Sequence, residues 1–264
     1  MPSKILEAKN ITMQFGGLKA VENFSVEVHE GELLGLIGPN GAGKTTVFNM
    51  LTGVYRPTHG EIFIGGQSTK GLKAFEISHL GMTRTFQNIR LFKDLSVLEN
   101  VMIASHQNTN YSMTQAILKS DKFFTEEAAL TQKAMNLLKI FELDLKADLQ
   151  SGGLPYGEQR KLEIVRALAT DPKIILLDEP AAGMNHKETE VLMHLIAYIR
   201  KEFKLSVLLI EHDMKLVMGI CERLLVLDHG ILISQGAPEN VRKDPKVIAA
   251  YLGADTDASS ELHA

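Results

Sequence analysis

A glycine-rich stretch at residues 38–46 carries the strongest chemical pattern in the sequence. It reads GPNGAGKTT and fits the phosphate-loop pattern GxxxxGK(S/T). Glycines let the backbone curl so that successive N–H groups face an anion. Lys44 would place positive charge at the β and γ phosphates, and Thr45 would offer a hydroxyl to Mg²⁺. ATP is therefore expected at Gly38, Pro39, Asn40, Gly41, Ala42, Gly43, Lys44, Thr45 and Thr46.

Two carboxylates end an apolar run at residues 174–177, which is followed by Asp178 and Glu179. Asp178 could hold Mg²⁺ through water, and Glu179 could orient or deprotonate the water that attacks the γ phosphate. Taken alone, this segment also fits a strand that runs into a solvated acidic turn. The phosphate loop upstream favours the catalytic interpretation.

A histidine, His212, follows another apolar run at residues 207–210. A lone histidine is usually a surface or core residue. If this run and residues 174–177 end at the same edge of a sheet, the imidazole could donate to the γ phosphate or fix Glu179 and the attacking water. We therefore predict a catalytic role for His212.

The elements that must position these side chains alternate along the chain. Short apolar runs predict strands buried on both faces, as in a parallel sheet covered by helices, and they lie at residues 33–37, 174–177, 207–210 and 224–227. Helical patterns occupy residues 45–51, 158–169 and 187–201. The alternation predicts an α/β fold. It also favours a phosphate loop over an ordinary glycine-rich turn, because a strand precedes the loop and a helix follows it.

The segment from about residue 88 to 151 differs from the rest, because helix formers and polar residues dominate it. We interpret it as an inserted, mostly helical lobe. Residues 255–264 are small, polar and acidic and are expected to form a frayed tail.

The bulk composition narrows the class of protein. With 45% hydrophobic and 23% charged residues in 264, the chain is an ordinary globular protein. A formal charge of −4 makes nucleic acid an unexpected partner. The single cysteine, Cys221, fits a reducing cytoplasm. No apolar run reaches the ~18 residues that span a bilayer, so any membrane role requires a partner.

The motifs together resemble the ATP-binding cassette (ABC) family, in the family's order, from the start of the chain to about residue 254. The resemblance implies a P-loop NTPase (RecA-like) core with an antiparallel β subdomain and an inserted α-helical subdomain. The core would comprise residues 1–87 and 152–254, with the helical subdomain at about 88–151. The implied activity is ATP hydrolysis with Mg²⁺ as cofactor.

Two further site residues follow from this resemblance. Phe15 falls where the family places an aromatic residue that stacks on adenine; a core phenylalanine in a strand turn is the alternative. Gln87, in the segment TFQN, falls at the family's glutamine loop, which touches Mg²⁺ and the attacking water and links the core to the helical lobe. Without the family, Gln87 would be considered a surface residue.

The family signature LSGGQ aligns with the segment LPYGE just before a helical pattern. In the family this segment contacts ATP held by the opposite subunit, so a dimer with two nucleotides at its interface is implied. The segment SGG at residues 151–153 also resembles the signature. We reject this alternative alignment because it would not place the signature directly before the helix whose N-terminus must face phosphate. Pro155 replaces the serine hydroxyl of the signature. The expected ATP contacts are Leu154, Tyr156, Gly157 and Glu158.

Three segments resemble one subgroup of the family, the first of the two ATPases of bacterial branched-chain amino-acid importers. They lie at residues 83–92, 181–185 (AAGMN) and 236–253. The implied partners are a second, identical or related, ATPase subunit, integral membrane permease subunits and, indirectly, a solute-binding protein. The implied location is the cytoplasmic face of the cell membrane. Urea, amide or lipopolysaccharide transporters are alternatives, as is a soluble ABC ATPase that acts on DNA or ribosomes. A small-molecule kinase would explain only the phosphate loop.

Overall fold

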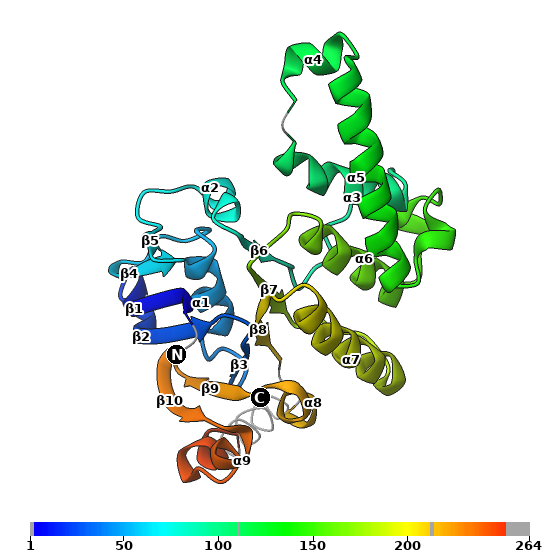
Figure 1. The fold of residues 1–264 in the computed structure, drawn as a ribbon. Helices are drawn as coiled ribbons and strands as arrows, with labels where there is room; N and C mark the ends of the chain where they lie inside the picture. The colour runs from blue at the N-terminus through cyan, green and yellow to red at the C-terminus, as the bar shows by residue number, and fades with distance from the viewer. Residues whose placement is uncertain (1–2, 110, 212–213, 252–264) are drawn as a thin grey trace.

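The computed structural model describes residues 3–109, 111–211 and 214–251 (Figure 1). Its strands are β1 (Lys4–Phe15), β2 (Leu18–His29), β3 (Leu33–Ile37), β4 (His59–Ile64), β5 (Gln67–Ser68), β6 (Met82–Arg84), β7 (Ile174–Asp178), β8 (Ser206–Ile210), β9 (Arg223–Asp228) and β10 (Ile231–Gly236). Its α-helices are α1 (Lys44–Leu51), α2 (Ala74–His79), α3 (Val97–Ser105), α4 (Met113–Ile117), α5 (Asp121–Ile140), α6 (Tyr156–Leu168), α7 (His186–Glu202), α8 (Met214–Ile220) and α9 (Pro238–Val241). Three short 3₁₀ helices are η1 (His106–Asn108), η2 (Asp144–Lys146) and η3 (Ser151–Gly153).

A six-stranded sheet with the order β10-β9-β3-β8-β7-β6 forms the centre of the molecule. Strands β9, β3, β8, β7 and β6 run parallel, and β10 is an antiparallel edge strand. Every residue of β3, β7 and β8 is buried, as the continuous apolar runs predict for strands covered on both faces. The α/β prediction is confirmed.

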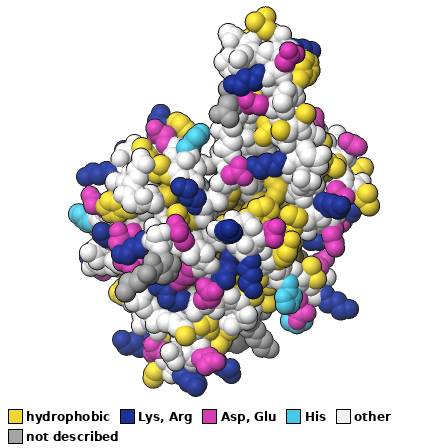
Figure 2. All heavy atoms as spheres, viewed as in Figure 1, with side chains coloured by type: hydrophobic (Ala, Val, Ile, Leu, Met, Phe, Trp, Pro, Cys, Tyr) yellow, Lys and Arg dark blue, Asp and Glu magenta, His cyan; other side chains and the backbone are white. Residues whose placement is uncertain are grey.

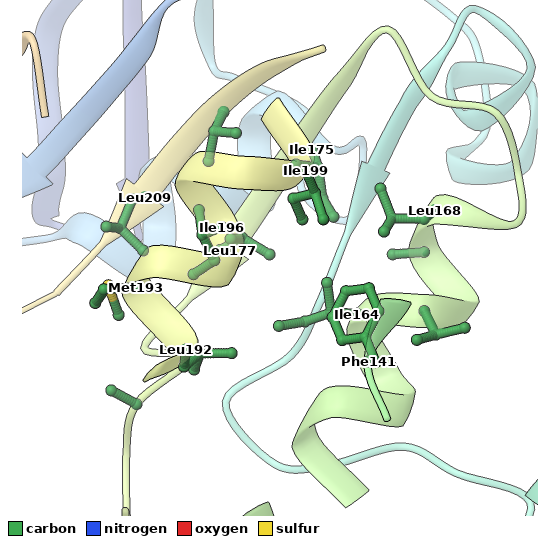
Figure 3. Packing of buried hydrophobic residues seen from close by; sticks show 14 of the residues in the cluster. Phe141, Ile164, Leu168, Ile175, Leu177, Leu192, Met193, Ile196, Ile199 and Leu209 are labelled. Atoms are coloured by element: carbon green, nitrogen blue, oxygen red, sulfur yellow. The ribbon is translucent and has the colours of Figure 1, made fainter. Parts of the chain in front are cut away.

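Alternate residues of the central strands pack into two different hydrophobic cores. In β7, Ile174 and Leu176 join one core with α1 and strands β1, β2 and β4. Ile175 and Leu177 join the other with α3, α5, α6 and α7. Figure 3 shows this second core, where residues of α6 and α7 such as Ile164 and Ile196 pack around Ile175 and Leu177. Helices α1 and α6 therefore cover opposite faces of the sheet.

The second sheet is antiparallel, with the order β2-β1-β4-β5. The turn between β1 and β2 is formed by Gly16 and Gly17. Residues of β1 and β2 alternate in part between buried and exposed, which is typical of a sheet with one face on the core. The predicted antiparallel β subdomain is thus present.

Between β6 and β7 the chain forms the helices α3, α4, α5 and α6, and Figure 1 shows α4 and α5 projecting away from the two sheets. Serine caps begin three of these helices: Ser96 at α3, Ser112 at α4 and Ser120 at α5. An isolated bridge between Ser96 and Gln150 is the single strand-like contact in the described part of residues 88–151. Because α6 packs on α3 and α5 as well as on β6, the division at residues 87 and 152 stays a prediction.

No helix in the part of the chain that the structure describes combines the length and the apolar character needed to cross a bilayer.

Candidate functional site

The glycine-rich loop lies between β3 and α1, where strand, loop and helix meet as the pattern requires. Gly38, Gly41 and Gly43 have φ values of 151°, 78° and 98°, which side chains disfavour. Gly43 is the N-cap of α1, and no side chain caps this helix. The first N–H groups of a helix lack acceptors within the helix. The start of α1 is therefore suited to bind an anion such as a phosphate.

The ammonium group of Lys44 lies inside this loop. Lys44 is only 6% exposed, and its Nζ donates to the carbonyl oxygens of Gly38 at 2.7 Å and Pro39 at 2.8 Å. Burial lowers the pKa of Lys44, while the carboxylates of Glu179 and Asp178 act in the opposite direction. The ends of β3 and β7 lie on either side of Ile210 in β8, so the loop and both acidic residues lie at one edge of the sheet.

Gly38→Ala tests how closely this loop is packed. A Cβ atom on Gly38 would lie 2.0 Å from the carbonyl oxygen of Leu227, so the backbone of β9 or of the loop must move. We expect the free energy of unfolding to fall by at least about 2 kcal/mol, as measured by urea denaturation. Gly219→Ala is the control, because a Cβ there has no heavy atom within 4 Å. Equal stability of both variants would contradict the packing described here.

Asp178 ends β7 and forms a buried ion pair that the sequence did not indicate. Its Oδ2 atom accepts from Nη2 of Arg84 at 2.6 Å, and Nη1 of Arg84 donates to Oδ1 of Asn49 at 2.6 Å. The guanidinium lies 5.5 Å from the ring centre of Phe48 and 5.0 Å from that of Phe86. Arg84 therefore joins β6 and α1 to the carboxylate that was predicted to bind Mg²⁺.

Glu179 and Gln87 meet although 92 residues separate them. Nε2 of Gln87 donates to Oε2 of Glu179 at 2.9 Å. The backbone N–H of Glu179 donates to the carbonyl oxygen of Ile210 at 3.0 Å, which fixes the acidic turn to the end of β8. Glu179 has a left-handed φ of 45°. Glu211, buried at the end of β8, accepts from the N–H of Ala181 at 3.1 Å and supports the same turn.

Phe15 ends β1 on the hairpin that passes beside the glycine-rich loop. A Cβ on Gly43 would lie 2.6 Å from the carbonyl oxygen of Ala20 in β2, so hairpin and loop touch. The ring of Phe15 is 44% exposed and meets Tyr55 edge-on, with 5.4 Å between ring centres. An exposed aromatic ring beside a phosphate loop is suited to stack on a base.

The segment aligned with the signature begins α6, with Pro155 as N-cap and Tyr156 as the first helical residue. The rejected segment at residues 151–153 forms the separate 3₁₀ helix η3, where the N–H of Gly152 donates to the carbonyl oxygen of Lys93. Leu154 is buried, so its side chain belongs to the core. Both carboxylate oxygens of Glu158 accept from Lys146 at 2.6 Å. Contact between residues 154–158 and a second nucleotide stays a prediction.

The oxygen atoms of Thr45, Asp178 and Gln87 are hard ligands of the kind that Mg²⁺ prefers. Among the described residues, no three His, Cys, Asp or Glu side chains could hold a metal together. Mg²⁺ is commonly bound through one or two carboxylates together with substrate phosphates. His212 lies outside the described residues.

Sequence reasoning did not identify Arg84, Arg160, Glu163 or Glu211, which are all charged and largely buried. Arg160 and Glu163 are three residues apart on α6 and form an ion pair of 2.8 Å. Their spacing on a predicted helix was a usable signal for a pair. It gave no sign that the pair is buried.

Comparisons with known proteins agree with this site. Residues 21–182 match the family described as ABC transporter, and residues 232–257 match the family described as branched-chain amino acid ATP-binding cassette transporter. The chain is 46% identical over 253 residues to the high-affinity branched-chain amino acid transport ATP-binding protein LivG of Escherichia coli (strain K12), covering 96% of this chain and 99% of that protein.

Solved structures give the same result. The chain is similar to the ADP conformation of MJ1267, an ATP-binding cassette of an ABC transporter, with a TM-score of 0.82, 30% identity and coverage of 95% of this chain and 99% of that one. It is also similar to a dimeric post-hydrolysis state of the ATP-binding cassette MJ0796 bound to ADP and Pi, with a TM-score of 0.73, 26% identity and coverage of 88% and 98%.

Proposed function

Because the chain belongs to the ABC transporter family, as one of its ATP-hydrolysing cassettes, we propose that it drives the import of branched-chain amino acids. The observation that carries the catalytic part is the hydrogen bond between Gln87 and Glu179, at the edge of the sheet where the loop of Lys44 also follows β3. The amino-acid specificity is supported by the similarity to LivG over nearly the whole chain and by the match at residues 232–257.

In the proposed reaction, the loop at residues 38–46 binds the phosphates of ATP and Phe15 stacks on adenine. Mg²⁺, held by Thr45, Asp178 and Gln87, would neutralise charge on the β and γ phosphates. Glu179 orients or deprotonates the attacking water. The hydrogen bond from Gln87 keeps the Glu179 carboxylate in place, and Lys44 offsets negative charge. His212 would donate to the γ phosphate or fix Glu179 and the attacking water.

We further propose that two cassettes enclose two ATP molecules. Helices α1 and α6 lie on opposite faces of the central sheet, so the phosphate loop and residues 154–158 of one chain are poorly placed to share one nucleotide. Residues 154–158 of the opposite chain would complete each site. The similarity to a dimeric cassette supports this arrangement.

A membrane-embedded permease is the proposed partner at the cytoplasmic face of the cell membrane. An apolar groove of about 680 Å³ lies between α2, β6 and α6 and is lined in part by Val54, Ile77, Leu91 and Phe92. The side chains of Val54 and Phe92 are 51% and 47% exposed. Phe86 and residues 90–92 line this groove and flank Gln87 in the chain. A permease segment bound in the groove could therefore respond to the binding and hydrolysis of ATP at the nucleotide site.

The alternative partners, DNA and ribosomes, find less support on the face that Figure 2 shows. Figure 2 shows a face on which Lys and Arg side chains are interspersed with Asp and Glu. An electrostatic site for nucleic acid is typically a continuous basic patch. Cosedimentation with DNA or ribosomes at physiological salt would favour that alternative.

Transport measurements test the specificity. Reconstituted with its permease subunits and its solute-binding protein, the chain is expected to drive ATP-dependent uptake of leucine, isoleucine and valine into proteoliposomes. Urea and a short aliphatic amide are the control solutes. ATP-dependent uptake of a control solute without uptake of leucine would contradict the proposed substrate and leave the ATPase assignment intact.

A dimer test addresses the proposed assembly. MgATP is expected to convert catalytically impaired full-length chain from monomer to dimer in sedimentation velocity, whereas MgADP is not. Bound nucleotide without a dimer, even with the permease present, would contradict the proposal.

A further inference from the structure

Arg160 has the largest fully buried side chain among the described residues. A buried charge is costly unless partners satisfy it. Nη1 of Arg160 donates to Oε2 of Glu163 at 2.8 Å, and Glu163 is itself only 5% exposed. Burial raises the pKa of the Glu163 carboxyl, which the Arg160 guanidinium opposes. We call Arg160 and Glu163 the α6 pair.

The α6 pair also binds the backbone at the start of the glutamine loop, although Nε of Arg160 is buried without a hydrogen-bond partner among the described residues. Nη1 of Arg160 donates to the carbonyl oxygen of Phe86 at 2.6 Å, and Nη2 donates to that of Gln87 at 2.7 Å. Oε1 of Glu163 accepts from the N–H of Phe86 at 3.2 Å. Residues 86 and 87 belong to no strand or helix. The α6 pair therefore supplies backbone contacts that regular secondary structure supplies elsewhere.

The same guanidinium also contacts the segment predicted to face the second nucleotide. Nη2 of Arg160 also donates to the Tyr156 hydroxyl at 3.3 Å. The Tyr156 ring packs against Gly183, where a Cβ would lie 3.1 Å from the ring, in the turn after Glu179. Arg160 thus lies between Gln87, which contacts Glu179, and the first turn of α6.

We propose that the α6 pair is a positioning device that couples the placement of Gln87 at one nucleotide site to the start of α6, which faces the other nucleotide of the dimer. This inference rests on the proposed function and assigns a role to residues that do not touch the nucleotide. Movement of α6 when the dimer closes would move the carbonyl oxygens of Phe86 and Gln87 with it. The Gln87 side chain, and through it Glu179, would then adopt the hydrolytic geometry when the opposite site is engaged.

An arginine is required for this connection. Its planar group presents several N–H donors in a fixed arrangement, so it can bind two carbonyl oxygens and a carboxylate at once. A lysine ammonium is a compact charge on a flexible chain. Arg160→Lys should therefore retain part of the wild-type kcat, and Arg160→Met should retain less.

A double-mutant cycle between Arg160 and Gln87 tests the proposal on the full-length chain. Arg160→Met is expected to lower kcat by about tenfold or more in the wild-type background, and by no more than about twofold in a Gln87→Ala background. Arg160→Met should change the affinity for MgATP, measured by equilibrium fluorescence, by less than about threefold relative to the background in which it is made. If the α6 pair only stabilises the fold, the two losses in kcat multiply, and that result would overturn the proposal.

Arg223→Met is the matched control, because Arg223 also joins a carboxylate and a backbone carbonyl. Its Nε donates to Oε1 of Glu32 at 2.7 Å, and its Nη2 donates to the carbonyl oxygen of Glu27. We expect this control to lose stability and to keep its kcat. An equal loss of kcat at Arg223 would also overturn the proposal.

If Arg160→Met does not fold, Glu163→Gln replaces it in the double-mutant cycle with Gln87→Ala. Glutamine keeps the size of the Glu163 side chain. Non-multiplying losses with Gln87→Ala support the proposal, and multiplying losses oppose it. Wild-type chain that binds no ATP would instead contradict the proposed function. If the wild-type chain hydrolyses ATP and the losses in kcat multiply, only the proposed role of the α6 pair is contradicted.

Discussion

Glu179→Gln is expected to lower ATP turnover by a factor of about 10² to 10⁴, the usual contribution of a positioned general base. Glutamine has nearly the same size and can still accept from Nε2 of Gln87, which donates to Glu179 at 2.9 Å. It cannot accept the proton of the attacking water. The affinity for MgATP should therefore remain within about threefold of wild type, because the phosphate contacts are unchanged. Phosphate release and equilibrium nucleotide binding are the measurements.

Glu190→Gln is the control for this experiment. Glu190 is exposed on α7 and lies 3.3 Å from His186, so its replacement should leave turnover unchanged. Turnover that survives in Glu179→Gln would remove Glu179 from its proposed role. Loss of MgATP binding in that variant would instead indicate that the carboxylate shapes the binding site.

Lys44→Met is expected to weaken MgATP binding by about 100-fold or more, since charge-assisted contacts to phosphate are among the strongest in proteins. The Lys44 ammonium donates to the carbonyl oxygens of Gly38 and Pro39. Its removal takes away a buried positive charge and the contacts that hold the loop. Methionine fills similar space, so the loss should appear in nucleotide binding, measured by isothermal titration calorimetry.

Lys243→Met serves as the control, because Lys243 is exposed just after α9. Thermal unfolding without nucleotide should show whether Lys44→Met remains folded. Folded Lys44→Met protein that binds MgATP as tightly as wild type would exclude the predicted role of the loop.

The sequence was informative where a local pattern has one physical explanation. Residues 33–37 were predicted as a buried strand and form β3, because a continuous apolar run suits a strand covered on both faces. The predicted run at residues 174–177 forms β7, and the strand continues through Asp178. The pattern thus placed the first acidic residue at a strand end, where catalytic groups commonly gather in α/β sheets.

Long-range burial of charge could not be predicted in the same way. Arg84 and Asp178 are 94 residues apart, and Arg160 meets Phe86 across 74 residues. A helical pattern with Arg160 and Glu163 equally describes an exposed ion pair. Nothing local distinguishes the buried case, because the partners come from another part of the chain. Likewise, the helical pattern was predicted from residue 158, but α6 begins at Tyr156 in the structure.

The left-handed backbone at Glu179 also limits how the protein can be improved. A non-glycine residue at a φ of 45° is held there at a cost of order 1–3 kcal/mol. Glycine would relieve that strain and remove the carboxylate in one step. Selection for heat resistance alone would therefore favour an inert protein at this position, and engineering for durability must keep residue 179 fixed.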